Sequence, residues 1–264
     1  MENSKVRILY RDDDLVAVYK PAGVKMHRSP GDSRRQAFML QETRELTGRK
    51  VFPVHRLDQP TSGVLLFAFS SEVARLLAEQ FRQQTIAKRY VAVARGIMEP
   101  AGTIDYPLVP NAYEPKSGQT PKPAVTDFKR LATAELPIAL GRFPSCRYSL
   151  AAVYPRTGRM HQIRRHFHHI SHPVVGDTAY GDGRHNRLFR EQFGCHRLLL
   201  ACVALALNHP RTGAPLHLTA PLDLSFQEVG EHLGWCFVST EQTSAHPSEG
   251  KCRYSSWEKI ENRS

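Results

Sequence analysis

Short apolar runs, none of them long enough to cross a lipid bilayer, are the feature that most constrains how this chain folds. The longest run covers residues 198–207, which is the length of a buried β-strand. Residues 64–69 form a second run directly after a group of turn-forming residues. Strand-like and helix-like segments do not alternate strictly along the chain. This order predicts an α+β protein with a mostly antiparallel sheet.

Local patterns predict the individual elements. Strands are expected at residues 6–10, 15–19, 64–69, 88–95, 125–131, 147–154 and 198–207. Helices are expected at residues 36–47, from Ser70 or Ser71 to Phe81, and at residues 159–170 and 222–233. Residues 107–123 contain five prolines and predict a long loop, the one place where a boundary between two halves would fall. Residues 181–194 are expected to form an arginine-rich loop with one helical turn.

Charge is concentrated in one part of the chain. The formal net charge is +11, and residues 142–197 hold ten arginines, no lysine and three acids, a local excess of +7. Arginine without lysine favours fork-like recognition of phosphate groups over mere solubility. The segment therefore indicates a nucleic-acid partner, with an inert basic surface as the alternative.

Cysteine usage and the N-terminal residues indicate a cytoplasmic protein. The five cysteines are odd in number, and no two have CxxC spacing. This pattern argues against a disulfide framework and against a zinc ribbon, and it fits free thiols in a reducing compartment. Residues 1–10 contain no apolar stretch of the kind found in secretory signals, and no segment predicts a membrane partner.

One carboxylate stands out in residues 54–63, which read Val-His-Arg-Leu-Asp-Gln-Pro-Thr-Ser-Gly. Asp58 follows Arg56 by two residues, and turn formers separate it from the apolar run at 64–69. Both side chains are therefore expected on a short loop braced by a sheet, a setting in which catalytic residues are common. The alternative is a structural Arg–Asp pair in a surface turn.

Two further groups contain residue types that serve catalysis. Tyr90 lies in an expected strand and could stack on a base, although a sheet-face aromatic is the alternative. Residues 157–166 bring His161, Arg164 and Arg165 together at helical spacing. These cations could bind an anion or hold Asp58 ionised, and a solvated basic helix face is the alternative.

A metal site is disfavoured. The nearby histidines have no accompanying glutamate, and Pro173 ends the helix that would present them. The four histidines concerned are His166, His168, His169 and His172.

The motifs occur in an order that resembles the RluA-type pseudouridine synthases. The string at 55–63 is similar to the active-site motif of that family, and Gly158-Arg159-x-His161-Gln-Ile-Arg164 is similar to a later one. Residues 20–23 (Lys-Pro-Ala-Gly), Lys88 with Tyr90, and 197–200 (Arg-Leu-x-Leu) complete the match, which extends over residues 6–233. The resemblance implies a mixed, largely antiparallel sheet with flanking helices and a cleft across it.

The resemblance also implies an activity: the isomerisation of uridine to pseudouridine in RNA, with no cofactor or metal. Asp58 would be the catalytic nucleophile, Arg164 would pair with it, and Tyr90 would pack on the target base and aid proton transfer. Arg56 would help to flip that base out of the RNA helix, because a stacked base is out of reach. RNA binding and base flipping are expected from five residues: Arg56, His55, Arg159, His161 and Arg165.

Details of the chain are most similar to the TruC branch of that family, which acts on uridine 65 of tRNA. A uridine of rRNA and a noncatalytic RNA-binding module are the alternatives. Two departures from the family pattern are Tyr19, where asparagine is usual, and Ala201-Cys202, where His-Ala is usual. We expect one catalytic domain at residues 6–238 without a separate S4 domain, a polar and disordered tail at 239–264, and a monomer.

Overall fold

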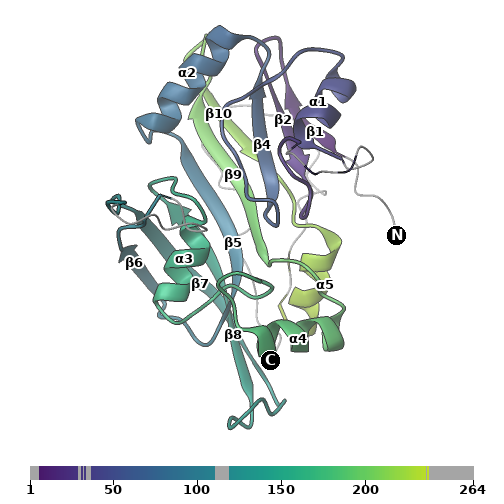
Figure 1. The fold of residues 1–264 in the computed structure, drawn as a ribbon, viewed down its shortest axis with the longest axis vertical. Coiled ribbons are helices and arrows are strands. Elements are labelled where there is room, and N and C mark those ends of the chain that lie inside the picture. Colours follow the sequence, from purple (N-terminus) through teal and green to yellow (C-terminus); the bar gives the residue numbers. More distant parts are fainter. Residues whose placement is uncertain are drawn as a thin grey trace, which may run out of the picture.

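The computed structural model describes residues 6–28, 31, 33, 37–110, 119–235 and 237. Within them, ten strands form one sheet with five helices around it (Figure 1). The strands are β1 (Arg7–Arg11), β2 (Leu15–Lys20), β3 (Phe52–Pro53), β4 (Ser62–Ala68), β5 (Ala87–Arg95), β6 (Ala101–Asp105), β7 (Val125–Leu136), β8 (Cys146–Pro155), β9 (Leu200–Asn208) and β10 (Pro215–Thr219). The helices are α1 (Met39–Thr47), α2 (Ser71–Arg82), α3 (Gln162–His169), α4 (Gly183–Phe193) and α5 (Leu224–His232).

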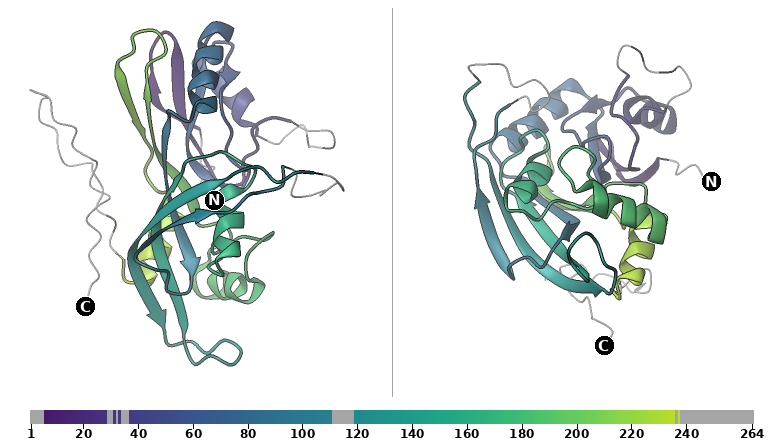
Figure 2. Two further views of the ribbon diagram at one scale, coloured as in Figure 1. Left: turned by 90° about the vertical axis from the view of Figure 1, so that its left-hand side faces the viewer. Right: turned by 60° about the horizontal axis from the view of Figure 1, so that its bottom comes forward.

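The sheet is mixed, and nearly all of its strand pairs are antiparallel. The strand order is β1-β2-β4-β9-β5-β8-β7-β6, with β10 beside β9 and β3 beside β4. In the described residues, β4 and β9 form the one parallel pair, through Ser62–Ala201 and Gly63–Cys202. Figure 2 shows how strongly the sheet twists, so that β6, β7 and β8 bend round α3. The predicted α+β class with a mixed, largely antiparallel sheet is confirmed.

Apolar side chains on both faces of the central strands hold the helices in place. Along β5, Val91 and Val93 belong to a core cluster with residues of α4 and α5. Ala92 and Ala94 belong to a different cluster, which includes residues of α3. Successive side chains of a strand point to opposite faces, so β5 is covered on both sides. This double cover explains the continuous apolar runs in the sequence.

Gly63 allows β4 to approach β9 closely. Its φ angle is +118°, a region that L-residues rarely adopt. A β-carbon at this position would lie 2.0 Å from the carbonyl oxygen of Cys202 in β9. The glycine that closes the 54–63 motif is therefore required by the contact between the two parallel strands, and it fixes where the preceding loop leaves the sheet.

Most predicted strands are confirmed, some with shifted ends. The segment 125–131 is longer than predicted, because β7 extends to Leu136 as a hairpin with β8. The short strands β3, β6 and β10 were not predicted. The helix from Ser70 is confirmed, since the Ser70 hydroxyl accepts from the backbone N–H of Val73 at 3.2 Å.

The loop predicted at 181–194 is wrong, because most of it is the helix α4. Asp182 caps the helix by accepting from the backbone N–H of Arg184 at 3.0 Å, and Gly194 ends it in the left-handed conformation. Leu188 and Phe189 supply a narrow apolar face that packs into the core. Arg187 and Arg190, which flank this pair, obscured the face in the sequence.

The structure describes three of the five cysteines and does not describe the tail. Among the described residues, Cys146, Cys195 and Cys202 are buried and free. Residue 36 and the tail at 239–264 lie outside the described residues, as do Cys236 and Cys252. No helix within the described ranges has both the length and the apolar character needed to cross a membrane.

Replacing Gly63 by alanine is expected to lower the free energy of unfolding by about 2–4 kcal/mol, because the methyl group meets backbone and φ is positive. Urea denaturation followed by circular dichroism measures the change. Gly183→Ala is the matched control, since a β-carbon there meets nothing within 4 Å and alanine favours the first turn of α4. An equal loss in both variants would contradict the argument.

Candidate active site

Asp58 lies in a tight turn between β3 and β4. The backbone N–H of Thr61 donates to the carbonyl oxygen of Asp58 at 3.0 Å, closing the turn. Lys20, at the end of β2, is fully buried beneath it and donates to the carbonyl oxygens of Pro21, Gln59 and Thr61 at 2.8–3.0 Å. An ammonium group has three N–H donors, so a single side chain holds both flanks of the turn. Burial, and next the charge of Arg197, lower the pKa of Lys20 to about 7.

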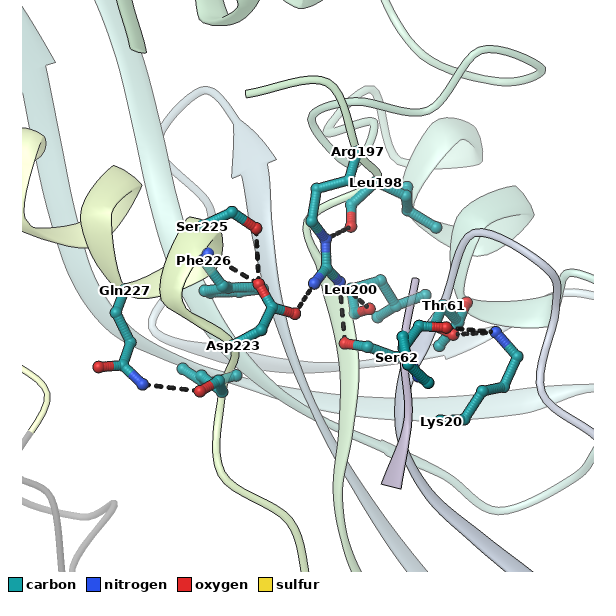
Figure 3. Close-up of polar contacts among 12 residues, drawn as sticks. Lys20, Thr61, Ser62, Arg197, Leu198, Leu200, Asp223, Ser225, Phe226 and Gln227 are labelled. Atoms are coloured by element: carbon teal, nitrogen blue, oxygen red, sulfur yellow. Dashed lines mark hydrogen bonds and ion pairs between the residues drawn. The ribbon is translucent and has the colours of Figure 1, made fainter. Parts of the chain in front are cut away.

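A second cation, the partly buried Arg197, holds the start of β4 from the other side (Figure 3). Arg197 donates to the hydroxyl of Ser62 at 2.9 Å and to the carbonyl oxygen of Leu200 at 3.2 Å. It also forms an ion pair with Asp223, the N-cap residue of α5. The hydroxyl of Tyr19, one of the departures from the family pattern, donates to Asp223 at 3.1 Å. The support of the Asp58 turn therefore extends to α5.

Two cationic or titratable side chains of the 157–166 segment approach the Asp58 carboxylate. Nη1 of Arg164 lies 3.6 Å from Oδ2, and Nε2 of His161 lies 3.9 Å from Oδ1. The Asp58 side chain is 18% exposed, whereas those of Arg164 and His161 are 4% and 6% exposed. The predicted proximity of Asp58, His161 and Arg164 is therefore present, with only the carboxylate open to solvent.

A second carboxylate, which sequence reasoning missed, fixes the orientation of Arg164. Its Nε and Nη2 both donate to Asp177 at 2.7 Å, so Nη1 is the nitrogen directed at Asp58. Asp177 also accepts from the backbone N–H groups of Ala179 and Tyr180. Burial opposes the ionisation of Asp177, but these hydrogen bonds and the Arg164 charge outweigh it and lower its pKa. A Gly-Asp pair in a turn gave no signal that would have identified it.

The predicted helix at 159–170 begins three residues late, and this correction shapes the site. The Gln162 side chain accepts from the backbone N–H of Arg159 at 2.9 Å and from the Thr157 hydroxyl at 2.7 Å. These bonds stabilise a turn before α3, and His161 takes a left-handed conformation with φ of +53°. The hydrogen bonds of the Gln162 side chain therefore stabilise a turn in the residues before it, and the helix begins only at Gln162.

Two of the predicted RNA-binding arginines donate hydrogen bonds to backbone carbonyl groups of this protein. Arg165 donates to the carbonyl oxygen of Val109 at 2.9 Å, and Arg159 donates to that of Pro123 at 3.0 Å. Both carbonyl groups belong to the connection between β6 and β7, of which residues 111–118 lie outside the description. Part of the arginine excess at 142–197 is thus used to attach this connection to α3.

The remaining predicted residues of the 54–63 motif differ in exposure. Arg56 is exposed and lines both hollows described below. His55 accepts at Nε2 from the backbone N–H of Leu66 at 2.9 Å and stacks on Phe81. Burial, and then Lys88, lower the pKa of His55 to about 3, so its imidazole is neutral. His55 therefore joins the loop that carries Arg56 and Asp58 to strand β4.

The cleft at Asp58 consists of two hollows that share its loop. One has a volume of about 760 Å³ and extends over Tyr90 and Leu200, while the other, of about 710 Å³, extends past Lys25 and Met26. Tyr90 lies opposite Cys202 in the sheet; burial, and next Cys202, raise the Tyr90 pKa well above 10. Its hydroxyl therefore stays protonated and can donate a hydrogen bond.

The four histidines considered above as metal ligands all make hydrogen bonds or ring contacts within the protein. His166 bonds to Thr126 and to the carbonyl oxygen of Tyr106, and His169 stacks on the Tyr106 ring. His168 and His172 each bond through Nδ1 to a backbone carbonyl oxygen. Within the described residues, no three histidine, cysteine or acidic side chains gather in the way a metal ion requires.

A family model described as RNA pseudouridylate synthase matches residues 14–169, which include the Asp58 turn and α3. This chain belongs to the RNA pseudouridylate synthase family. Its expected resemblance to pseudouridine synthases is confirmed.

Relatives and solved structures agree with this membership. The chain is 48% identical to tRNA pseudouridine synthase C of Pectobacterium carotovorum, over 87% of this chain and 62% of that protein. It is 46% identical to the protein of the same name from Haemophilus ducreyi, over 88% and 97%. The solved structure of human RNA pseudouridylate synthase domain containing 1 has a TM-score of 0.65 at 27% identity, covering 83% of this chain and 84% of that chain. This chain thus spans less than two thirds of the Pectobacterium protein and nearly all of the Haemophilus one.

Replacing Asp177 by asparagine is expected to cost about 3–5 kcal/mol of stability at pH 7, because it leaves Arg164 buried without its bidentate partner. The folded-state pKa of Asp177 lies below the ordinary value of 3.8. Its contribution is therefore fully present above pH 3.8 and is lost as the pH falls through the lower folded value. Urea titrations at pH 7 and below pH 4 measure this, and an unchanged difference between wild type and variant at the two pH values would contradict it.

Proposed function

We propose that this protein isomerises a uridine of tRNA to pseudouridine, with uridine 65 as the target. The observation that carries the proposal is the position of Asp58. Among the described residues that line the larger hollow, it is the only carboxylate, and it faces Arg164. The names of the tRNA pseudouridine synthase C relatives support tRNA as the substrate.

Asp58 is the catalytic carboxylate in this proposal. It can attack the ribose, attack the base or remove a sugar proton, and each route requires the ionised form. Nη1 of Arg164 lies 3.6 Å from the carboxylate and gives it a partner of opposite charge. In every route the C1'–N1 bond breaks, the uracil turns, and C5 bonds to C1'. The isomerisation transfers no electrons to an outside group, so the proposal includes no cofactor or metal.

The larger hollow receives the extruded base. Tyr90 and Leu200 supply its apolar floor, and Tyr90 packs on the uracil ring. Because the Tyr90 hydroxyl keeps its proton, it donates a hydrogen bond to a uracil oxygen and stabilises negative charge on the detached base. The exposed Arg56 occupies the space that the flipped nucleotide leaves in the RNA stack.

RNA binding involves the rims of the two hollows. Arg56, Arg159 and His161 line the hollows, and His55 acts by holding the Arg56 loop on β4. Arg165, which lines neither hollow in the described residues, contributes its charge from α3. Residues 6–238 act as one catalytic domain and the protein works as a monomer, in this proposal. A uridine of rRNA is the alternative substrate.

Replacing Asp58 by asparagine is expected to abolish turnover, lowering the rate by more than about 10³-fold, while RNA affinity is retained. The assay is tritium release from tRNA transcripts labelled at uracil C5, since that carbon loses its hydrogen when it becomes the glycosidic carbon. Asp13→Asn, in an exposed turn between β1 and β2, is the matched control. Release by the Asp58 variant at the wild-type rate would refute the role of Asp58. Absence of release from both tRNA and rRNA with wild type would refute the function.

RNA affinity is expected to fall steeply with salt, because phosphate contacts release counterions. Arg56→Gln removes one positive charge from the cleft, so it is expected to weaken tRNA binding and to make the slope of log affinity against log salt shallower by about 0.7–0.9, the value for one neutralised phosphate charge. Filter binding at salt concentrations from about 50 to about 200 mM measures this dependence of tRNA affinity on salt. Arg142→Gln, in the β7–β8 connection that projects at the bottom of Figure 1, is the control. A flat salt response would contradict a basic binding cleft.

A further inference from the structure

We propose that His161 and Tyr180 form a proton relay that removes the C5 hydrogen of the rotated uracil in the last step of the isomerisation. This inference rests on the proposed function and assigns a task that Asp58, Arg164 and Tyr90 leave open. After C5 bonds to C1', C5 still carries its hydrogen, and a base must take it.

The position of the His161 ring fits this task. Its Nε2 lies 3.9 Å from Oδ1 of Asp58, and its Nδ1 lies 3.0 Å from the Tyr180 hydroxyl. The ring borders both hollows, so a uracil that turns beside Asp58 passes it. The backbone at His161 is left-handed, with φ of +53°. Strained conformations of this kind persist where the surrounding structure enforces them, and they concentrate at functional sites.

The charged groups around His161 come from three segments. Asp58 faces it from the turn before β4, Arg164 and Arg165 from α3, and Asp177 and Tyr180 from the segment after α3. Burial is the largest influence and lowers the His161 pKa below 6.5, while Asp58 opposes the shift. The imidazole is therefore neutral at pH 7. With the proton on Nδ1, that nitrogen donates to the Tyr180 hydroxyl and Nε2 is a proton acceptor.

The step balances in atoms and electrons. Nε2 of His161 takes the proton from C5, the electron pair of the C5–H bond forms the C5–C6 double bond, and the pair of the C6–N1 double bond moves to N1. The Nδ1 proton passes to the Tyr180 oxygen, whose own proton passes to water. N1 of the uracil takes one proton from water, so the product is an isomer of the substrate. Tyr90 is unsuited to this step, because its hydroxyl keeps its proton.

The test is His161→Gln, measured in single turnovers on tRNA transcripts with hydrogen or deuterium at uracil C5. Loss of a general base slows pseudouridine formation by about 10²-fold. Removal of the C5 hydrogen then limits the rate, so a primary isotope effect larger than that of wild type is expected. Saturating enzyme keeps any change in tRNA affinity out of the measured rate. Tyr180→Phe keeps the ring beside Arg164 and is expected to show the same effect to a smaller degree. His217→Gln, an exposed histidine on β10, is the matched control.

The pH profile provides the second readout. The wild-type rate is expected to fall as the pH drops below the lowered pKa of His161, because imidazolium accepts no proton, and the His161 variant is expected to lack this limb. A variant slowed equally with both isotopes and with the wild-type pH profile would overturn the relay, as would a variant of wild-type rate. Either result leaves wild-type pseudouridine formation intact. Failure of the proposed function is different, since wild type itself would then form no pseudouridine.

Discussion

The guanidinium of Arg164, shared between two carboxylates, is the interaction on which the rest of the site depends. Asp177 takes Nε and Nη2 in a bidentate contact, which leaves Nη1 directed at Asp58. A buried cation needs a full set of acceptors, and the two acids supply them in unequal shares. The tighter, fully buried partner fixes the guanidinium plane. The looser partner, Asp58, is thereby left close enough to be stabilised and open enough to meet a substrate.

The same division between a buried support and an exposed reacting group recurs beneath the Asp58 turn. Lys20 holds the turn through three carbonyl oxygens, and Arg197 holds the start of β4 through Ser62 and the α5 cap. Gly63 lets β4 and β9 meet at the point where the turn joins the sheet. Rigid support of this kind positions a catalytic group at low reorganisation cost. The buried lysine and the partly buried arginine are thus part of the structure of the site, although neither opens onto the substrate.

The arginine-rich segment shows how one composition can serve several purposes. Ten arginines between residues 142 and 197 indicated a nucleic-acid partner. At least six of them instead make contacts within the chain: Arg164 in a buried ion pair, Arg156, Arg184 and Arg197 in more exposed ion pairs, and Arg159 and Arg165 with backbone carbonyl groups. Membership of the RNA pseudouridylate synthase family supports the inference about the partner. The charge count alone overestimated how much of the segment is available to phosphate groups.

Sequence alone determined the features that depend on local pattern. Short apolar runs determined the sheet, and the string around Asp58 indicated the carboxylate, because alternation and turn chemistry act between near neighbours. Only the tertiary structure decided the roles of Asp177, Lys20 and His161. Lys20 and His161 act through contacts with the Asp58 turn, which is distant from both in the chain, and Asp177 lies outside the motif that contains Arg164. Such pairings leave no periodic signal, so the support of the site became visible only once the chain was folded.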